Sequence, residues 1–304
     1  MNSIDGPVAS HGLSKALSEE DLRAGLRQAG YLADDDLVTT LWLADRLERP
    51  LLLEGDAGVG KTSLAQALAR MLNLRLVRLQ CFEGLDMAQA AYEWNYSRQL
   101  MRIRLDDRQG GVKESDVFHP DYLLERPLMQ AIRSAERCVL LIDEIDRADE
   151  AFEAFLLEVL SEYQITVPEW GTLVARHIPL VVLTSNGSRE LSDALRRRCL
   201  YHWLDYPDLA REIAIAQSSV PQADQRLVSE AVQLVQRLRG EDLNKPPGIA
   251  ECLDWIRALH GMGFQTLPEE MDRLLRTLAC LLKTREDRFA LTSDRLRNLY
   301  ERAH

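Results

Sequence analysis

The apolar residues of the chain follow two different patterns. In the first part, short runs that are β-rich or continuously apolar alternate with stretches in which apolar residues recur every three or four positions. The runs lie at residues 51–54, 74–80, 138–143 and 178–184, with a fifth candidate at residues 200–204. Continuous apolar runs are typical of strands covered on both faces, as in a parallel sheet flanked by helices. This part of the chain therefore predicts an α/β fold.

Two helices are expected ahead of the first strand. Residues 18–21 have the order of a capping box, apolar residues follow at helical spacing, and Gly30 ends the segment. A second helical pattern covers residues 37–47 and stops before Pro50. Residues 1–17 come before these patterns, and we expect them to be a flexible tail.

After residue 206 every periodic segment is helical. Three apolar faces recur there at helical spacing. They comprise Leu227, Val228, Ala231, Val232, Val235 and Leu238 in the first, Leu253, Ile256 and Leu259 in the second, and Leu274, Leu275, Leu278, Leu281 and Leu282 in the third. We therefore expect an α/β domain at residues 18–205 and a small all-helical domain at residues 206–304.

The strongest candidate for chemistry follows the first predicted strand. Residues 55–62 read Gly-Asp-Ala-Gly-Val-Gly-Lys-Thr, which fits the P-loop pattern G-x-x-x-x-G-K-[ST], and a helical pattern comes next. The glycines let backbone N–H groups turn around phosphate oxygens, and the N-terminus of the helix adds partial positive charge. In such a loop Lys61 reaches the β- and γ-phosphates, and the Thr62 hydroxyl can hold Mg²⁺. A glycine-rich turn with a chance lysine is the weaker alternative, because strand, loop and helix come in the right order.

The nucleotide is thus expected to contact one continuous segment. Its residues are Gly55, Asp56, Ala57, Gly58, Val59, Gly60, Lys61, Thr62 and Ser63.

Two adjacent carboxylates end the predicted strand at residues 138–143. Asp143 can enter the coordination sphere of Mg²⁺, while Glu144 can orient and deprotonate the attacking water. Acidic residues also end many strands without a catalytic role. The P-loop earlier in the chain favours the catalytic interpretation.

The next strand also ends in polar residues. The run at residues 178–184 continues into Ser185 and Asn186. If this strand lies between the other two, Asn186 would sit beside the γ-phosphate and could orient the water or sense hydrolysis. Ser-Asn-Gly is also a good turn sequence, so this interpretation depends on the P-loop and the carboxylates.

Three consecutive arginines, Arg196, Arg197 and Arg198, precede the fifth predicted strand. A guanidinium suits a γ-phosphate because it offers a planar fork of donors and a permanent charge. A solvated basic helix end is the alternative. We expect at least one of the three to act on phosphate, and the residues themselves leave open which one.

Charge and hydropathy narrow the classes of partner. The net charge of -11, from 48 acidic against 37 basic residues, disfavours a broad nucleic-acid surface. No apolar run approaches the roughly 20 residues of a membrane-spanning helix, so no integral membrane segment is expected. The first residues lack the basic start and apolar stretch of a secretory signal. We expect a cytoplasmic protein, with peripheral membrane contact through a partner left open.

Taken in this order, the P-loop, the Asp-Glu strand end, the asparagine-tipped strand, the arginine and the helical C-terminal part resemble an AAA+ ATPase. Several segments more narrowly resemble the MoxR family, and three are similar to its CoxD-like branch. The MoxR-like segments are residues 31–35, 49–55, 143–149, 167–171 and 182–186. The CoxD-like segments are Gln-Cys-Phe-Glu-Gly-Leu-Asp at 80–86, Tyr-Glu-Trp-Asn-Tyr at 92–96 and residues 245–255.

The resemblance implies an AAA+ P-loop NTPase fold with a five-stranded parallel sheet flanked by helices and a small helical lid domain. It implies ATP and Mg²⁺ as cofactors and adds Tyr31 and Leu32 to the nucleotide contacts. It also implies a ring, usually a hexamer, in which an arginine from the neighbouring subunit completes each site. In this arrangement the arginine stands directly before the Cys or Phe that opens the fifth strand, which here is Arg198.

The resemblance also implies partners. MoxR-like ATPases typically act as chaperones with a partner that carries a von Willebrand factor A domain. CoxD-like members are linked to the maturation of molybdenum-containing carbon monoxide dehydrogenase-type enzymes. We therefore expect an ATP-hydrolysing chaperone that remodels a metalloenzyme client. The alternative is an AAA+ motor that acts on nucleic acid, for which steep weakening of binding by salt would be the sign.

Two features depart from the family or leave a role open. Many AAA+ proteins carry a phosphate-contacting arginine early in a helix of the small domain, whereas residues 246–251 contain none and Lys245 is the nearest cation. A sensor role there is therefore in doubt. In the segment 83–121, three aromatic residues cluster with arginines before the loop at residues 108–112. Two interpretations stay open. The cluster faces a ring pore or a protein client, or its aromatic residues pack a local helix against the body of the ring.

Overall fold

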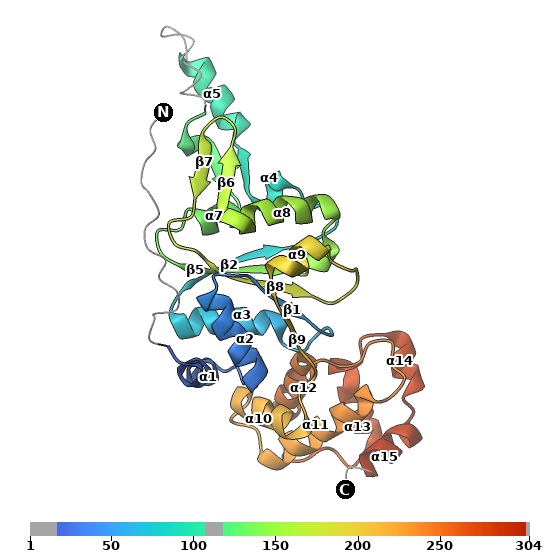
Figure 1. Cartoon of the computed structure of the whole chain (residues 1–304). Coiled ribbons are helices and arrows are strands. Elements are labelled where there is room, and N and C mark those ends of the chain that lie inside the picture. Colours follow the sequence, from blue (N-terminus) through green and yellow to red (C-terminus); the bar gives the residue numbers. More distant parts are fainter. Residues whose placement is uncertain (1–16, 107–117, 302–304) are drawn as a thin grey trace. The chain divides into compact units, whose positions relative to one another are not determined.

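The computed structural model describes residues 17–106 and 118–301 and divides them into two compact units (Figure 1). The first unit holds the described residues up to 29, residues 33–54 and residues 62–203. The second holds residues 30–32, residues 55–61 and the described residues from 204 onward. The P-loop residues 55–61 thus group with the C-terminal part of the chain. The tail predicted at residues 1–17 lies almost wholly outside the described residues.

The first unit is built on a parallel sheet of five strands in the order β2-β5-β8-β1-β9. The strands are β1 (Leu51–Glu54), β2 (Arg75–Gln80), β5 (Cys138–Asp143), β8 (Leu180–Ser185) and β9 (Leu200–Trp203). All five predicted strands are confirmed, and β1, β5 and β8 are buried along their whole length. Complete burial explains their continuous apolar sequence, because helices cover both faces.

The first unit also contains helices. They are α1 (Glu19–Gln28), α2 (Asp35–Arg46), α3 (Lys61–Leu72), α4 (Met87–Ala90), α5 (Tyr96–Asp106), α7 (Pro127–Ile132), α8 (Glu150–Glu162) and α9 (Asp193–Arg198). In Figure 1, α2 and α3 lie on one side of the sheet and α7 and α8 on the other. The predicted capping box begins α1: the Ser18 hydroxyl accepts a hydrogen bond from the N–H of Asp21, and the Asp21 carboxylate accepts one from the N–H of Ser18.

Two small antiparallel sheets were missed by the sequence analysis. β3 (Tyr92–Trp94) pairs with β4 (Leu123–Glu125), and β6 (Gln164–Val167) pairs with β7 (Gly171–Val174). Their strands have only three or four residues, too short for a period-two pattern to stand out. Short 3₁₀ turns, η1 (Pro120–Tyr122) and η2 (Ile145–Arg147), lie before β4 and after β5.

The second unit contains the C-terminal helices. They are α10 (Leu209–Ser219), α11 (Gln225–Arg239), α12 (Ile249–Gly261), α13 (Met271–Thr277), the 3₁₀ turn η3 (Leu278–Cys280), α14 (Arg285–Ala290) and α15 (Ser293–Glu301). The three predicted apolar faces meet in one core around the fully buried Trp255, whose indole N–H donates to the Thr277 hydroxyl at 2.9 Å. None of the described helices is long and apolar enough to cross a bilayer.

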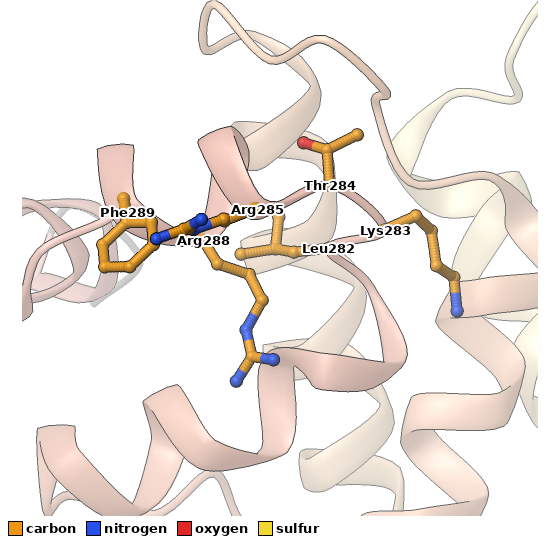
Figure 2. A pocket seen from close by; sticks show the side chains of 6 residues that line it. All are labelled: Leu282, Lys283, Thr284, Arg285, Arg288 and Phe289. Atoms are coloured by element: carbon orange, nitrogen blue, oxygen red, sulfur yellow. The ribbon is translucent and has the colours of Figure 1, made fainter.

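A basic pocket of about 510 Å³ opens beside α14 (Figure 2). Its lining residues are Leu282, Lys283, Thr284, Arg285, Arg288 and Phe289. The guanidinium of Arg285 stacks 5.3 Å from the centre of the exposed Phe289 ring.

Candidate nucleotide site

The P-loop connects β1 to α3. Gly58 and Gly60 have φ angles of 82° and 101°, a left-handed conformation that side chains other than glycine rarely adopt. The Lys61 side chain, which is 7% exposed, donates from Nζ to the carbonyl oxygens of Gly55 at 2.6 Å and Asp56 at 2.7 Å. The ammonium group is thus held inside the curve of the loop, where phosphate oxygens bind in P-loop proteins.

The remaining predicted nucleotide contacts divide between buried and exposed positions. Gly55 and Val59 are buried, whereas Asp56, Ala57, Gly58 and Ser63 are exposed. The predicted residues Tyr31 and Leu32 belong to the same unit as the loop. A Cβ atom added to Gly60 would lie 3.9 Å from Cε2 of Tyr31, and the Leu32 carbonyl accepts from Arg211 at 2.8 Å. Tyr31 therefore lies close to the loop.

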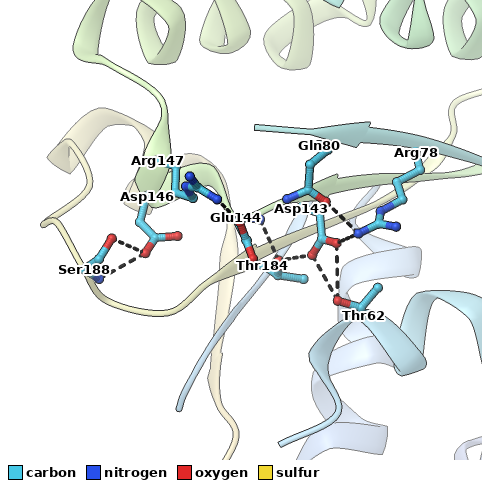
Figure 3. Close-up of polar contacts among 9 residues, drawn as sticks. All are labelled: Thr62, Arg78, Gln80, Asp143, Glu144, Asp146, Arg147, Thr184 and Ser188. Carbon is cyan, nitrogen blue, oxygen red and sulfur yellow. Dashed lines mark hydrogen bonds and ion pairs between the residues drawn. The ribbon is translucent and has the colours of Figure 1, made fainter. Parts of the chain in front are cut away.

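Asp143 is the hub of a polar cluster at the end of β5 (Figure 3). Its Oδ1 accepts hydrogen bonds from the hydroxyls of Thr184 at 2.6 Å and Thr62 at 3.1 Å. Its Oδ2 accepts from Arg78 at 2.6 Å, and Arg78 also donates to the Gln80 side chain at 2.6 Å. Asp143 is only 3% exposed, so these donors compensate for the loss of water around its charge.

The donor atoms in this cluster fit a magnesium ion. Mg²⁺ prefers hard oxygen ligands, and the Thr62 hydroxyl and the Asp143 carboxylate are both of that kind. A site with few protein oxygens is usual for Mg²⁺, which is often completed by phosphates and water. The Arg78 guanidinium pairs with the same carboxylate, so Arg78 and a bound ion would both contact Asp143.

Glu144 leaves the strand in a strained conformation. Its φ and ψ of 56° and 50° lie in the left-handed region, which costs free energy for a residue with a side chain and often marks a functional site. Its N–H donates to the Thr184 hydroxyl at 2.9 Å, and its carboxylate accepts from Arg147 at 3.0 Å. The side chain is 33% exposed. Asp143 and Glu144 are therefore adjacent in sequence but have different partners and different access to water.

Asn186 follows β8, and the sheet order places this strand between β5 and β1. The condition attached to the Asn186 prediction is therefore met, and its side chain is exposed. The buried Asp146 holds the loop that follows, because it accepts from the N–H and the hydroxyl of Ser188 at 3.0 and 2.6 Å. Burial alone would raise the pKa of Asp146, but these hydrogen bonds and one from the Asn186 N–H hold it below its usual value.

The three consecutive arginines have different surroundings. The Arg196 guanidinium lies 3.5 Å from the buried Glu54 carboxylate, and the Arg197 side chain is exposed. Arg198 donates from Nε and Nη2 to the Leu160 carbonyl at 3.1 and 2.6 Å. It thereby satisfies a carbonyl in the last turn of α8, which has no partner within the helix.

Of the three aromatic residues that cluster at positions 92–96, two are packed inside. Tyr92 and Trp94 are 5% and 6% exposed. The Trp94 ring meets Phe118 edge to face at 5.3 Å between ring centres, and its N–H donates to Glu169 at 3.3 Å. Tyr92 and Trp94 therefore pack within the first unit and do not face a pore or a client.

The helix α5, by contrast, carries exposed apolar side chains. Tyr96, Leu100 and Met101 are 62%, 57% and 68% exposed. The Arg98 guanidinium lies over the Tyr122 ring. The loop at residues 108–112 lies outside the described residues.

Lys245 is exposed, and its backbone N–H donates to the buried Asp287 at 3.2 Å. The segment after it contacts the P-loop through its backbone: the N–H of Ile249 donates to the Gly58 carbonyl at 3.0 Å. The same segment carries a carboxylate: Oε2 of Glu251 would lie 3.6 Å from a Cβ atom added to Gly58.

We expect Lys245→Ala to change ATP turnover by less than about 2-fold, because an exposed charge of this kind contributes little. Steady-state kinetics at saturating ATP would check this result. A loss as large as that of Glu144→Gln would mean that Lys245 has replaced the missing arginine.

Several residues of the site were not singled out by the sequence. Arg78 lies inside an apolar run, and its pairing with Asp143 depends on β2 lying next to β5. Thr184 was visible only as part of a strand tip, yet it donates to Asp143 and accepts from Glu144. These two residues could have been found only by first predicting which strands are neighbours and then asking which polar side chains lie on adjacent strands.

Part of the chain matches a known family, and several known proteins are similar to the chain. Residues 50–199 match the family described as "AAA domain (dynein-related subfamily)". The chain is 28% identical over 246 residues to the gas vesicle ATPase GvpN of Haloferax mediterranei, covering 77% of this chain and 67% of that protein. It is also 28% identical to the gas vesicle ATPase GvpN1 of Halobacterium salinarum, covering 63% of this chain and 56% of the relative.

Of two further similarities, one covers less of each chain and the other is lower in identity. The chain is 31% identical to the chaperone protein ClpB of Tropheryma whipplei over 54% of this chain and 21% of that protein. A solved structure of the Thermotoga maritima RuvB Holliday junction branch migration motor is 18% identical, with a TM-score of 0.46, and the match covers 88% of this chain and 71% of the other. Residues 50–199 thus form an AAA domain, and together with the gas vesicle relatives this match supports an AAA+ ATPase of the MoxR type.

Proposed function

We propose that the chain hydrolyses ATP with Mg²⁺ as cofactor. The hydrogen bond between Thr62 and Asp143 carries this proposal, because it joins the residue after the P-loop lysine to the strand-end carboxylate. Lys61 binds the β- and γ-phosphates, and Thr62 and Asp143 hold the metal ion. When bound, Mg²⁺ screens the negative charge of the phosphates.

The residues that follow β5 and β8 act on the attacking water in this proposal. Glu144 accepts a proton from the water, and Asn186 orients it. Support comes from the sheet order, since β5 and β8 are neighbours and their carboxyl ends share one edge. The Glu144 N–H is held by Thr184, which also contacts Asp143.

We further propose that the chain works as a ring, a hexamer, with Arg198 of one subunit completing the site of its neighbour. AAA+ proteins typically assemble into rings, and an arginine in trans neutralises charge that develops on the γ-phosphate. Within one chain Arg198 caps α8, so this role requires Arg198 to exchange the Leu160 carbonyl for phosphate.

The proposed work is remodelling of a protein client in the maturation of a metalloenzyme, such as a molybdenum-containing carbon monoxide dehydrogenase-type enzyme. A partner with a von Willebrand factor A domain would recruit the client. Support comes from the CoxD-like segments in the sequence and from relatives named as a chaperone and as gas vesicle ATPases. The exposed apolar side chains of α5 offer a surface for a protein.

A trapping experiment can identify the client. A Glu144→Gln variant locked with ATP should retain from native lysate a protein with a von Willebrand factor A domain or an immature molybdenum enzyme. A Lys61→Ala variant, in which ATP affinity is expected to be weakened, is the control and should retain neither at an ATP concentration that leaves it unoccupied. Mass spectrometry of the bound fraction checks the result. Recovery of nucleic acid that resists moderate salt would instead favour a nucleic-acid motor.

A further inference from the structure

Two carbonyl groups of the P-loop receive hydrogen bonds from the C-terminal part of the second unit. The Tyr206 hydroxyl donates to the Ala57 carbonyl at 2.9 Å. The Ile249 N–H donates to the Gly58 carbonyl at 3.0 Å. Both carbonyls are therefore fixed by partners outside the loop, which restricts the conformations that the loop can adopt around phosphate.

One buried arginine connects these two donors. The Arg239 guanidinium stacks 4.4 Å from the centre of the Tyr206 ring. Its Nε donates at 2.7 Å to the carbonyl of Pro247, two residues before Ile249. Because its side chain is only 9% exposed, the guanidinium is confined between the two segments that hold the loop.

Glu212 fixes the orientation of this guanidinium. Its two oxygens accept from Nη1 and Nη2 of Arg239 at 2.6 and 2.7 Å, a bidentate pair. Glu212 is 1% exposed and also accepts from the Gln236 side chain at 3.0 Å. Bidentate pairs with carboxylates set direction as well as distance. All three guanidinium nitrogens of Arg239 have protein partners, so its effect on a nucleotide passes through other residues.

We propose that Arg239 is a positioning residue, which sets the conformation of the phosphate-binding loop through Tyr206 and the segment 247–249. The inference rests on the proposed function only in that it names the loop's ligand as ATP. A loop already held in its binding conformation binds more tightly, because less ordering is needed on binding. Burial and nearby acidic residues raise the pKa of Tyr206, so its hydroxyl stays protonated and can donate.

The same contact is sterically tight. A Cβ atom on Gly248 would lie 2.8 Å from the Cα of Gly58, which is backbone and cannot yield without moving the loop. Gly261, at the other end of α12, has nothing within 4 Å of such an atom. The two glycines therefore give a matched pair of substitutions in one helix.

The first test uses Tyr206→Phe and Arg239→Lys, with Arg257→Lys on the exposed Arg257–Asp254 pair as the control. Tyr206→Phe removes one hydroxyl and leaves the ring and the Arg239–Glu212 pair in place. We expect the amides of residues 55–61 to exchange hydrogen about 2- to 12-fold faster in the nucleotide-free protein, the range for one lost hydrogen bond. The control should not change, and the thermal unfolding midpoint of Tyr206→Phe should fall by no more than about 4 °C.

The second test measures affinity for Mg-ATP by fluorescence titration. Tyr206→Phe and Arg239→Lys should weaken binding, and the double variant should lose less than the product of the single losses, because Arg239 acts partly through Tyr206. Gly248→Ala should weaken binding by about 5-fold or more, whereas Gly261→Ala should not.

The two proposals fail in different ways. Unchanged exchange of the loop amides in both Tyr206→Phe and Arg239→Lys would overturn the role of Arg239, whatever the ligand. Wild-type protein that binds no ATP would overturn the proposed function, and the exchange experiment would still decide the inference.

Discussion

A Glu144→Gln variant should bind ATP as well as the wild type and lose turnover by about 10²- to 10⁴-fold, the usual contribution of a general base. Glutamine has the same size as glutamate but cannot accept the proton of the attacking water. The contacts of Asp143 with Thr62, Thr184 and Arg78 do not involve the Glu144 side chain. The substitution removes only the exposed ion pair with Arg147, and such pairs contribute little to the stability of the fold.

Lys61→Ala is the matched comparison. It removes a buried cation that lies inside the P-loop, so ATP affinity should fall by about 10- to 100-fold, as for the loss of a charged hydrogen-bond donor. Titration with a fluorescent ATP analogue and single-turnover assays separate the two effects. An equal loss of affinity in both variants would contradict the roles assigned to Lys61 and Glu144.

The second large effect concerns the boundary between subunits. Arg198→Ala should bind ATP but turn over about 10³- to 10⁵-fold more slowly, the range known for arginines supplied in trans. Mixed with Lys61→Ala, which is also inactive alone, it should regain part of the activity. The reason is that some interfaces then combine an intact P-loop with an intact Arg198.

Arg197→Ala is the control for this experiment, because Arg197 is exposed while Arg198 caps α8. Recovery of activity with Arg197→Ala but not with Arg198→Ala would move the role to Arg197. Thermal unfolding of Arg198→Ala distinguishes loss of the α8 cap from loss of a phosphate contact. Normal ATP turnover by strictly monomeric protein would contradict the proposal that the chain works as a ring.

The sequence predicted those parts of the fold whose signal is local. The five strands of the main sheet were found from short runs that are β-rich or continuously apolar, and α1 was found from its Ser18 capping box. The antiparallel pairs β3–β4 and β6–β7 were missed, since strands of three or four residues are too short to show a distinct pattern. The P-loop and the Asp143–Glu144 pair could be predicted because their chemistry requires a fixed spacing along the chain.

Contacts between polar side chains of different helices and strands could not be predicted. Arg78 reaches Asp143 only because β2 pairs with β5, and the periodicity of either strand says nothing of this. Arg239 likewise looks like one basic residue at the end of an amphipathic helix until its bidentate pair with Glu212 is seen. Long-range polar pairing depends on the order of elements in space, which a single sequence does not encode locally.

The strand order of the main sheet has a consequence for how the protein folds during synthesis. Leu51 in β1 pairs with Val182 and Leu200, so β1 gains its neighbours only when the chain has grown past β8 and β9. Until then one of the most apolar segments of the protein has no partner in the sheet, and contacts so distant in sequence form slowly. Nascent chains that stall before residue 180 should therefore be prone to aggregate and to depend on cellular holdases.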